Sequence, residues 1–261
     1  MSSKRHGAIL KLLEGRGSLS VTALSQELGV STETVRRDIR ALVDTGAAVR
    51  VHGAVGLAGQ MGEAPFDRRM RENAGAKRRI ARAMAQRIAD GASLMLDTGT
   101  TTSFLARELL GHRRLTVVTN SSDVARTLAT VNGNRVFMAG GELRGDSGAA
   151  LGASALAFIR DFTVEHAIIS AGAVDAGGVM DFDLHEAEFA RVALGCGARR
   201  AVLTDASKFG RRGFIRVGGF DMLDEVVTDR PPPPEVAQAM AAGGAALVLA
   251  EAAEPQVVAL G

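Results

Sequence analysis

Between residues 5 and 55, apolar side chains recur every three or four positions, which predicts three short amphipathic helices. Ser20 and Ser31 precede the second and third helices and are expected to cap them, and Gly29 supplies the tight turn between the two. Val49 to His52 then alternate like one strand of a small hairpin. The expected inward-facing stripes are Ile9, Leu12 and Leu13 in the first helix, Val21, Leu24 and Leu28 in the second, and Val35, Ile39 and Leu42 in the third.

From Lys77 onward, helices alternate with short apolar strands, which indicates an α/β fold with a mostly parallel sheet covered by helices. The glycine-rich stretch before it shows no sustained apolar period. We therefore predict domains at residues 1–56 and 76–261, joined by a linker at 57–75. Pro231 to Pro234 cannot extend a helix or a central strand, so they are expected to lead into a last helix. The expected strands are Ser93–Leu96, Leu115–Thr119, Arg135–Ala139, His166–Ser170, Ala201–Thr204, Glu225–Thr228 and Ala246–Leu249, with helices starting near Thr101, Ser122, Ala150 and His185.

Charge separates the same two parts of the chain. Residues 1–90 hold 16 Lys and Arg against 9 Asp and Glu, whereas residues 91–261 hold 15 against 20. A basic front on an acidic body indicates that only the front contacts a polyanion. The single cysteine, Cys196, excludes an intramolecular disulfide framework and fits a reducing cytoplasm. The first residues lack the apolar stretch of a signal peptide, and no apolar run is long enough to span a bilayer, so we expect a cytoplasmic protein.

The order cap, helix, glycine turn, cap, arginine-rich helix and basic hairpin is typical of a helix-turn-helix, whose second helix enters the DNA major groove. Arginines on such a helix can reach phosphates or guanine edges, and the helix N-terminus offers amides to a phosphate. A small helical bundle with a solvated charged face remains the alternative. The residues expected to contact double-stranded DNA are Ser31, Thr32, Glu33, Thr34, Arg36, Arg37, Arg40, Arg50 and His52.

Several motifs resemble one family. The segment VSTETVRRDIRALVDTGAAVRVHGAV resembles the signature of the DeoR family of bacterial repressors, and DTGTTT, VVTNSSDVA, MAGGELR and LTDASKFG follow in the family's order. The resemblance implies an N-terminal winged helix-turn-helix and a C-terminal α/β sugar-phosphate sensor domain, similar in fold to ribose-5-phosphate isomerase and coenzyme A transferases. One departure is that Gly53 is followed by Ala54, where the family usually has two glycines.

Polar or glycine residues follow successive predicted strands, at the edge where open α/β sheets bind ligands. They are also ordinary turn and cap residues, so this pattern alone leaves both readings open. The chain has only four lysines and 27 arginines, so the lysine at position 208 could be a ligand contact that requires this residue type. It could equally be an ordinary surface lysine. The resemblance to the family implies that the phosphate is held by Asp97, Gly99, Thr100, Thr101 and Thr102, with Asn120, Gly141 and Lys208 around the sugar.

The segment Asp181 to Glu186 packs two aspartates, a histidine and a glutamate into six residues. Such groups suit the hydroxyls of a polyol, although Asp183 could equally cap a helix whose first turn is acidic. The segments DFDLHEAE, GGELRGDSGAALG and VVTDRPPPPEV resemble the glycerol-phosphate-responsive branch of the DeoR family. That resemblance implies glycerol-3-phosphate as the effector and adds Asp183, His185 and Glu186 as effector contacts.

Together these features predict a transcriptional repressor of a carbohydrate or polyol catabolic operon, released from operator DNA by a phosphorylated sugar or polyol. One helix-turn-helix makes few contacts, so we expect a homodimer or homotetramer, assembled through the sensor domain. The histidines lack metal-ligand spacing and Cys196 lies in an apolar stretch, so no metal site, cofactor, membrane contact or catalytic residue is predicted. The rival interpretation is a sugar-phosphate isomerase or transferase using Asp205, Lys208 and Glu186 as acid and base; an activator or another phosphosugar is a further alternative.

Overall fold

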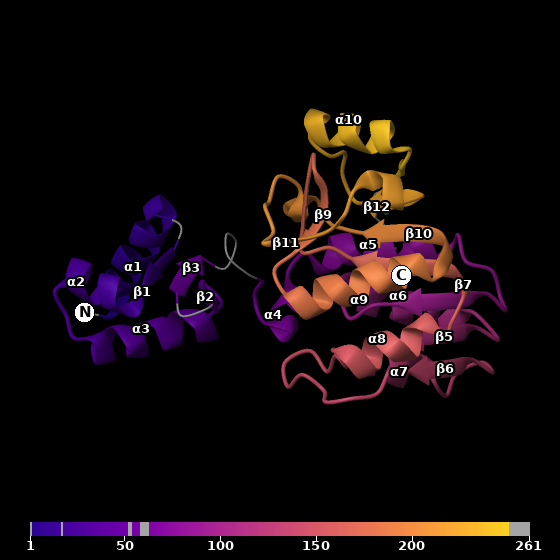
Figure 1. Ribbon diagram of the computed structural model, residues 1–261, viewed down its shortest axis with the longest axis horizontal. Coiled ribbons are helices and arrows are strands. Elements are labelled where there is room, and N and C mark those ends of the chain that lie inside the picture. The colour runs from indigo at the N-terminus through magenta and orange to yellow at the C-terminus, as the bar shows by residue number, and fades with distance from the viewer. Residues whose placement is uncertain (1, 17, 52–53, 58–62, 251–261) are drawn as a thin grey trace, which may run out of the picture.

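The N-terminal part is a helix-turn-helix closed by a small sheet (Figure 1). The structure is a computed structural model that describes residues 2–16, 18–51, 54–57 and 63–250. As the sequence predicts, the Ser20 and Ser31 side chains accept hydrogen bonds from the amides of Ala23 and Thr34. The elements are α1 (Ser2–Arg16), α2 (Val21–Leu28) and α3 (Thr32–Asp44), with β1 (Ser18–Ser20), β2 (Ala48–Val51) and β3 (Ala54–Leu57).

The three strands form an antiparallel sheet in the order β1-β3-β2, so the expected hairpin is β2 with β3, and β1 adds a strand that the sequence did not predict. The turn residue Gly29 is left-handed, with φ 62°. One charged residue lies in this core: Asp38 is buried and accepts hydrogen bonds from the guanidinium of Arg5. The apolar cluster of this part consists of Ile9, Leu13, Leu24, Val35, Ile39, Leu42, Ala48 and Val55.

Over residues 63–250 the chain forms a parallel seven-stranded sheet in the order β13-β12-β10-β7-β4-β5-β6. All seven predicted strands are present, three of them with the predicted bounds. A second, antiparallel sheet has the order β11-β9-β8 and was not predicted. The parallel strands are β4 (Ser93–Leu96), β5 (Thr116–Thr119), β6 (Arg135–Met138), β7 (Val164–Ser170), β10 (Gly197–Leu203), β12 (Glu225–Thr228) and β13 (Ala246–Leu249), and the others are β8 (Ala173–Asp175), β9 (Gly178–Asp181) and β11 (Ile215–Gly218).

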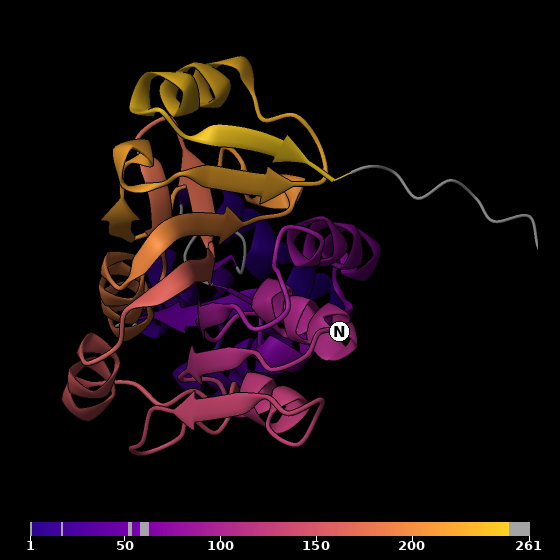
Figure 2. The same cartoon turned by 90° about the vertical axis from the view of Figure 1, so that its right-hand side faces the viewer.

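Helices cover both faces of the parallel sheet, which stands on edge between them in Figure 2. One apolar cluster joins one face to α5, α6 and α7, and the other joins the opposite face to α8, α9 and α10. Within the described ranges no helix is long and apolar enough to cross a membrane. The helices are α4 (Phe66–Arg71), α5 (Ala74–Ala85), α6 (Thr100–Glu108), α7 (Ser122–Leu128), α8 (Ala153–Arg160), α9 (Leu184–Gly195) and α10 (Pro234–Gly243), with short 3-10 turns η1 (Leu109–Gly111), η2 (Ala206–Lys208) and η3 (Phe220–Met222).

The expected linker at 57–75 is not wholly irregular. It contains α4 and the first residues of α5, and α4 lies at the junction of the two parts of the molecule in Figure 1. The helix is only six residues long and three of them are arginines, so it shows no apolar period. Phe66 alone among its side chains is buried. The domain boundaries themselves stay a prediction.

The strand order places the candidate site. The chain moves outward from β4 to β5 and β6, and then returns to the other side of β4 with β7, β10, β12 and β13. This reversal between β4 and β7 is a topological switch point, where open α/β sheets leave a crevice at the carboxyl ends of the strands. Asp97 follows β4, Asn120 follows β5, and Ser170 ends β7.

Candidate functional site

The outer face of α3 carries exposed arginines. Arg36, Arg37 and Arg40 are exposed, because Val35, Ile39, Leu42 and Asp38 take the buried positions of this helix. The result is a cationic helix surface held in place by an apolar core. At the N-terminus of α3, Ser31, Thr32 and Glu33 are exposed and Thr34 is half-buried.

Arg50 on β2 is exposed and lies beside α3, and its role as a wing contact stays a prediction. Its Nη2 donates to the Arg36 carbonyl at 3.4 Å, and its side chain lines a cavity that faces the α/β domain. The Arg36 guanidinium lies 3.6 Å from the Glu33 carboxylate. His52, the other expected contact on the hairpin, lies outside the described residues.

At the switch point, a small cavity of about 20 Å³ lies against Asp97. The Asp97 carboxylate accepts hydrogen bonds from the Ser170 amide at 2.9 Å and from the Thr102 hydroxyl at 3.0 Å. Nearby, the Thr98 hydroxyl donates to Asn120 Oδ1 at 3.0 Å, and Asn120 Nδ2 donates to the Ala150 carbonyl. These bonds fix the polar side chains that line the cavity.

Three carboxyl groups in and beside this cavity have pKa values above the usual range. Burial raises the pKa of Asp97 to about 7. Burial and the neighbouring Asp181 raise the pKa of Glu186 to about 8, and burial with the charge of Glu63 raises that of Asp181 to about 6. A protonated carboxyl can donate a hydrogen bond and a charged one can only accept, so this group of side chains can pair with polyol hydroxyls in either sense.

Charged side chains from α4 and the segment before it line one side of this small cavity. The Glu63 carboxylate is hydrogen-bonded to the Arg69 guanidinium and to the Lys208 ammonium group. Burial alone would raise the pKa of Glu63, but Arg69 and Lys208 outweigh it and lower the pKa to about 2. This carboxylate is therefore charged at neutral pH.

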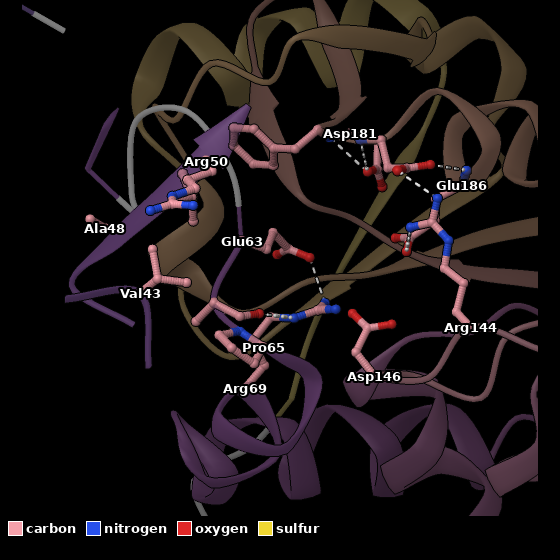
Figure 3. A pocket seen from close by; sticks show the side chains of 14 residues that line it. Val43, Ala48, Arg50, Glu63, Pro65, Arg69, Arg144, Asp146, Asp181 and Glu186 are labelled. Carbon is pink, nitrogen blue, oxygen red and sulfur yellow. Dashed lines mark hydrogen bonds and ion pairs between the residues drawn. The ribbon is translucent and has the colours of Figure 1, made fainter. Parts of the chain in front are cut away.

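A wider cavity of about 380 Å³ opens between the N-terminal part and the α/β domain, and Figure 3 shows its lining. Arg144 spans one wall, where its guanidinium donates to Asp183 at 2.8 Å and lies 3.7 Å from Glu186. Asp146 and Asp181 add further carboxylates. The arrangement offers fixed charges of both signs, which suits a polar ligand carrying hydroxyls and an anionic group.

Comparison with known proteins shows which family the chain belongs to. Residues 5–60 match the DeoR-like helix-turn-helix domain, and residues 72–230 match the DeoR C-terminal sensor domain. The chain belongs to the DeoR family. Within it, this DeoR-family chain is 35% identical over 239 residues to the glycerol-3-phosphate regulon repressor of Escherichia coli (strain K12), covering 91% of this chain and 95% of that protein. It is 34% identical over 230 residues to the HTH-type transcriptional repressor CsqR of the same organism, covering 88% of each.

Among solved structures, ribose 5-phosphate isomerase A from Neisseria gonorrhoeae is similar over 52% of this chain and 53% of its own, with 15% identity and a TM-score of 0.39. The predicted family and fold class, a helix-turn-helix followed by an α/β sensor domain, are confirmed. The expected similarity to coenzyme A transferases stays a prediction.

The structure of this DeoR-family chain brings together part of the predicted effector site. Asp97, Asn120 and Glu186 line the small cavity, and Lys208 reaches its edge through Glu63. Asp183 caps α9 and also lines the wider cavity, and its role as an effector contact stays a prediction.

Other predicted residues do not line these cavities, although the Thr102 hydroxyl is bonded to Asp97. Thr100, Thr101 and Thr102 are buried in the first turn of α6. Gly141 is exposed after β6, and the exposed His185 lies 3.5 Å from Glu188 on the same helix. None of them lines either cavity.

Sequence reasoning missed Glu63, Arg69 and Arg144, which are three of the charged side chains that line the wider cavity. Glu63 and Arg69 fall in the stretch that lacks an apolar period, so no pattern pointed to them. Asp181 stands in the acidic segment noted in the sequence, and its position there was the available signal.

Proposed function

We propose that this chain is a DNA-binding repressor of a carbohydrate or polyol catabolic operon, released from its operator by a phosphorylated sugar or polyol. The observation that carries the proposal is the pairing, in one chain, of an exposed arginine face on α3 with a mixed-charge cavity at the switch point of the sensor sheet. The relatives are named as transcriptional repressors, one of them for the glycerol-3-phosphate regulon, so glycerol-3-phosphate is the first compound to test.

In this proposal α3 contacts the major groove, with Arg36, Arg37 and Arg40 on phosphates and base edges. Asp97, Asn120 and Glu186 bind the hydroxyls of the effector. The protein acts in the cytoplasm as a homodimer or homotetramer that contacts repeated half-sites about 10 base pairs, or a multiple of that, apart.

The proposal makes the chain a regulator without turnover. The candidate acid and base groups support this, because Lys208 is bonded to Glu63 and Asp205 caps η2 by accepting from the Ser207 amide. Turnover of ribose-5-phosphate or glycerol-3-phosphate by the purified chain would favour the enzyme interpretation instead.

The decisive experiment is a DNA-shift assay on the upstream region of the chain's own gene. We expect nanomolar binding and its loss on titration with glycerol-3-phosphate, while fructose phosphates and ribose-5-phosphate serve as competing candidates. A complex that persists with every phosphorylated compound would contradict the proposed release.

Replacing Arg36 and Arg37 together with alanine tests the DNA-contacting face. Each lost contact to a base or phosphate costs about 1–3 kcal/mol, so the double variant should bind the operator at least about tenfold more weakly while its affinity for the effector is unchanged. The matched control is Arg126→Ala, which removes an arginine whose side chain is 80% exposed on α7 of the sensor domain. Equal operator binding by the double variant and the control would remove α3 from the interface.

A further inference from the structure

We propose that Arg69 and Lys208 form the phosphate subsite of the effector cavity, and that Glu63 occupies this subsite until a phosphate monoester displaces its carboxylate. The inference rests on the proposed function, because it concerns the same cavity. It adds the identity of the anion-binding groups and a direct link from ligand binding to the segment that joins the two domains.

The first argument is the way in which the Glu63 carboxylate is held. Its two partners come from distant parts of the chain, Arg69 from α4 and Lys208 from η2, and both are hydrogen-bonded to it. The three side chains are 12%, 14% and 13% exposed. A guanidinium and an ammonium group converging on one shielded carboxylate make a site that phosphate oxygens can also occupy, since both cations bind either anion.

The second argument is that side chains at the alternative phosphate position are already engaged. A Cβ atom at Gly99 would overlap the Ser170 hydroxyl, so Ser170 packs directly against the start of α6. Thr100, Thr101 and Thr102 are buried, and the Thr102 hydroxyl is bonded to Asp97. Arg69 and Lys208 are thus better placed for an incoming anion than the helix start that the sequence suggested.

The third argument is size. The cavity between Glu63, Asp97 and Asn120 measures about 20 Å³, which is room for about one water molecule. A phosphorylated polyol is several times larger. Asp97 is bonded to the Ser170 amide and Asn120 to the Ala150 carbonyl, so these side chains are fixed. We therefore expect the side of the cavity made by Glu63 and α4 to move when a ligand enters.

Displacement of Glu63 would change the contact between α4 and the DNA-binding domain. Arg68, the neighbour of Arg69, packs against the turn that follows α3, where a Cβ atom at Gly46 would overlap its guanidinium. On the sensor side the Arg69 carbonyl accepts a hydrogen bond from the buried Lys77 ammonium group. Consecutive residues of one short helix therefore contact the two domains, and a shift of α4 at the cavity changes its contact with the end of α3.

Charge favours the exchange. A phosphate monoester carries about 1.5 to 2 negative charges at pH 7 and three acceptor oxygens, against one charge on the carboxylate. An effector with this group can therefore compete with Glu63 for the same two cations, although the carboxylate is tethered beside them.

The test is Glu63→Gln in the full-length chain, measured by calorimetric titration with glycerol-3-phosphate, inorganic phosphate and glycerol. Removing the competing charge should tighten binding of both phosphate compounds by about tenfold and leave glycerol unchanged. Glu72→Gln is the matched control, because Glu72 lies in the same segment but pairs with Arg68. Thermal unfolding of both variants verifies that they fold like the parent.

A second measurement follows amide hydrogen exchange across residues 63–71 of the unaltered chain. Glycerol-3-phosphate should speed exchange there, since Glu63 is released, while Lys208→Met should abolish both phosphate binding and this change. Glu63→Gln binding phosphate no better than the parent, or effector binding without faster exchange at 63–71, would overturn the inference.

The outcomes also separate the inference from the proposed function. Release of operator DNA by a phosphorylated compound, with exchange at 63–71 unaltered, keeps the repressor and removes the role of Glu63. Tighter phosphate binding by Glu63→Gln, with no compound releasing DNA, keeps the subsite and removes the proposed regulation.

Discussion

Three hydrogen bonds converge on the Asp97 carboxylate, from the Ser170 amide, the Ser170 hydroxyl and the Thr102 hydroxyl. They lower the pKa of the carboxyl, but burial outweighs them and the pKa rises to about 7. At the scale of single residues, Asp97 directly follows a predicted strand, and in the structure it lines the small cavity. Its role as an effector contact stays a prediction. Its protonation depends on Ser170, more than seventy residues later, and no local pattern could reveal that neighbour.

The raised pKa of Asp97 predicts how stability varies with pH. An unfolded aspartate has a pKa near about 3.9, so between pH 4 and 7 the folded state binds more protons than the unfolded state, and the free energy of unfolding falls as pH rises. Asp97→Asn cannot titrate. The free energy of unfolding of the variant minus that of the parent should therefore rise across this window, with a slope of at most about 1.4 kcal/mol per pH unit. Urea unfolding at several pH values measures the slope, and a flat difference would contradict the buried carboxyl.

Elements whose signals are local were predictable from the sequence. The caps at Ser20 and Ser31 and the turn at Gly29 act within a few residues of themselves, and the structure places all three as expected. The strands β8, β9 and β11 were missed because each is only three or four residues long and is paired in a separate sheet whose partners come from distant segments. The helix α4 was missed because arginines dominate it.

The cap at the start of α3 gives a prediction at this scale. The Ser31 hydroxyl accepts from the Thr34 amide at 3.2 Å, so Ser31→Ala leaves that amide without its partner and should destabilise the helix-turn-helix by about 1 kcal/mol. Ser31→Asp should retain most of the stability, since aspartate caps equally well. Amide exchange within α3 measures both variants, and equal protection in Ser31→Ala and the parent would show that the cap contributes nothing.

For the whole molecule, the division of charge seen in the sequence corresponds to two separately packed parts. The basic front becomes the exposed face of α3, and the acidic body contributes the carboxylates of the cavities. The site itself was only partly predictable, because two of its charged side chains, Glu63 and Arg69, come from the segment between the domains. The tertiary fold brings Glu63 and Arg69 to the sensor cavity, and no local sequence pattern indicates this position.

Salt dependence of operator binding tests the proposed interface of the whole assembly. If each protomer neutralises about four phosphates, a dimer should show a slope of about −7 when the logarithm of the binding constant is plotted against that of salt concentration. The Arg36 and Arg37 double variant should show a shallower slope, since fewer counterions are released. Affinity that does not change with salt would exclude binding through these arginines.

The apolar cluster of the helix-turn-helix shares no residue with the two clusters that pack the sensor sheet. Neither domain therefore needs the other to complete its interior, and an exchange of the first 57 residues between relatives would leave both interiors whole. One contact that such a chimera must preserve is the glycine after α3 against the arginine of α4. We expect a chimera with a bulkier residue at the position of Gly46 to fold and to bind operator DNA, but to lose the response of DNA binding to the effector.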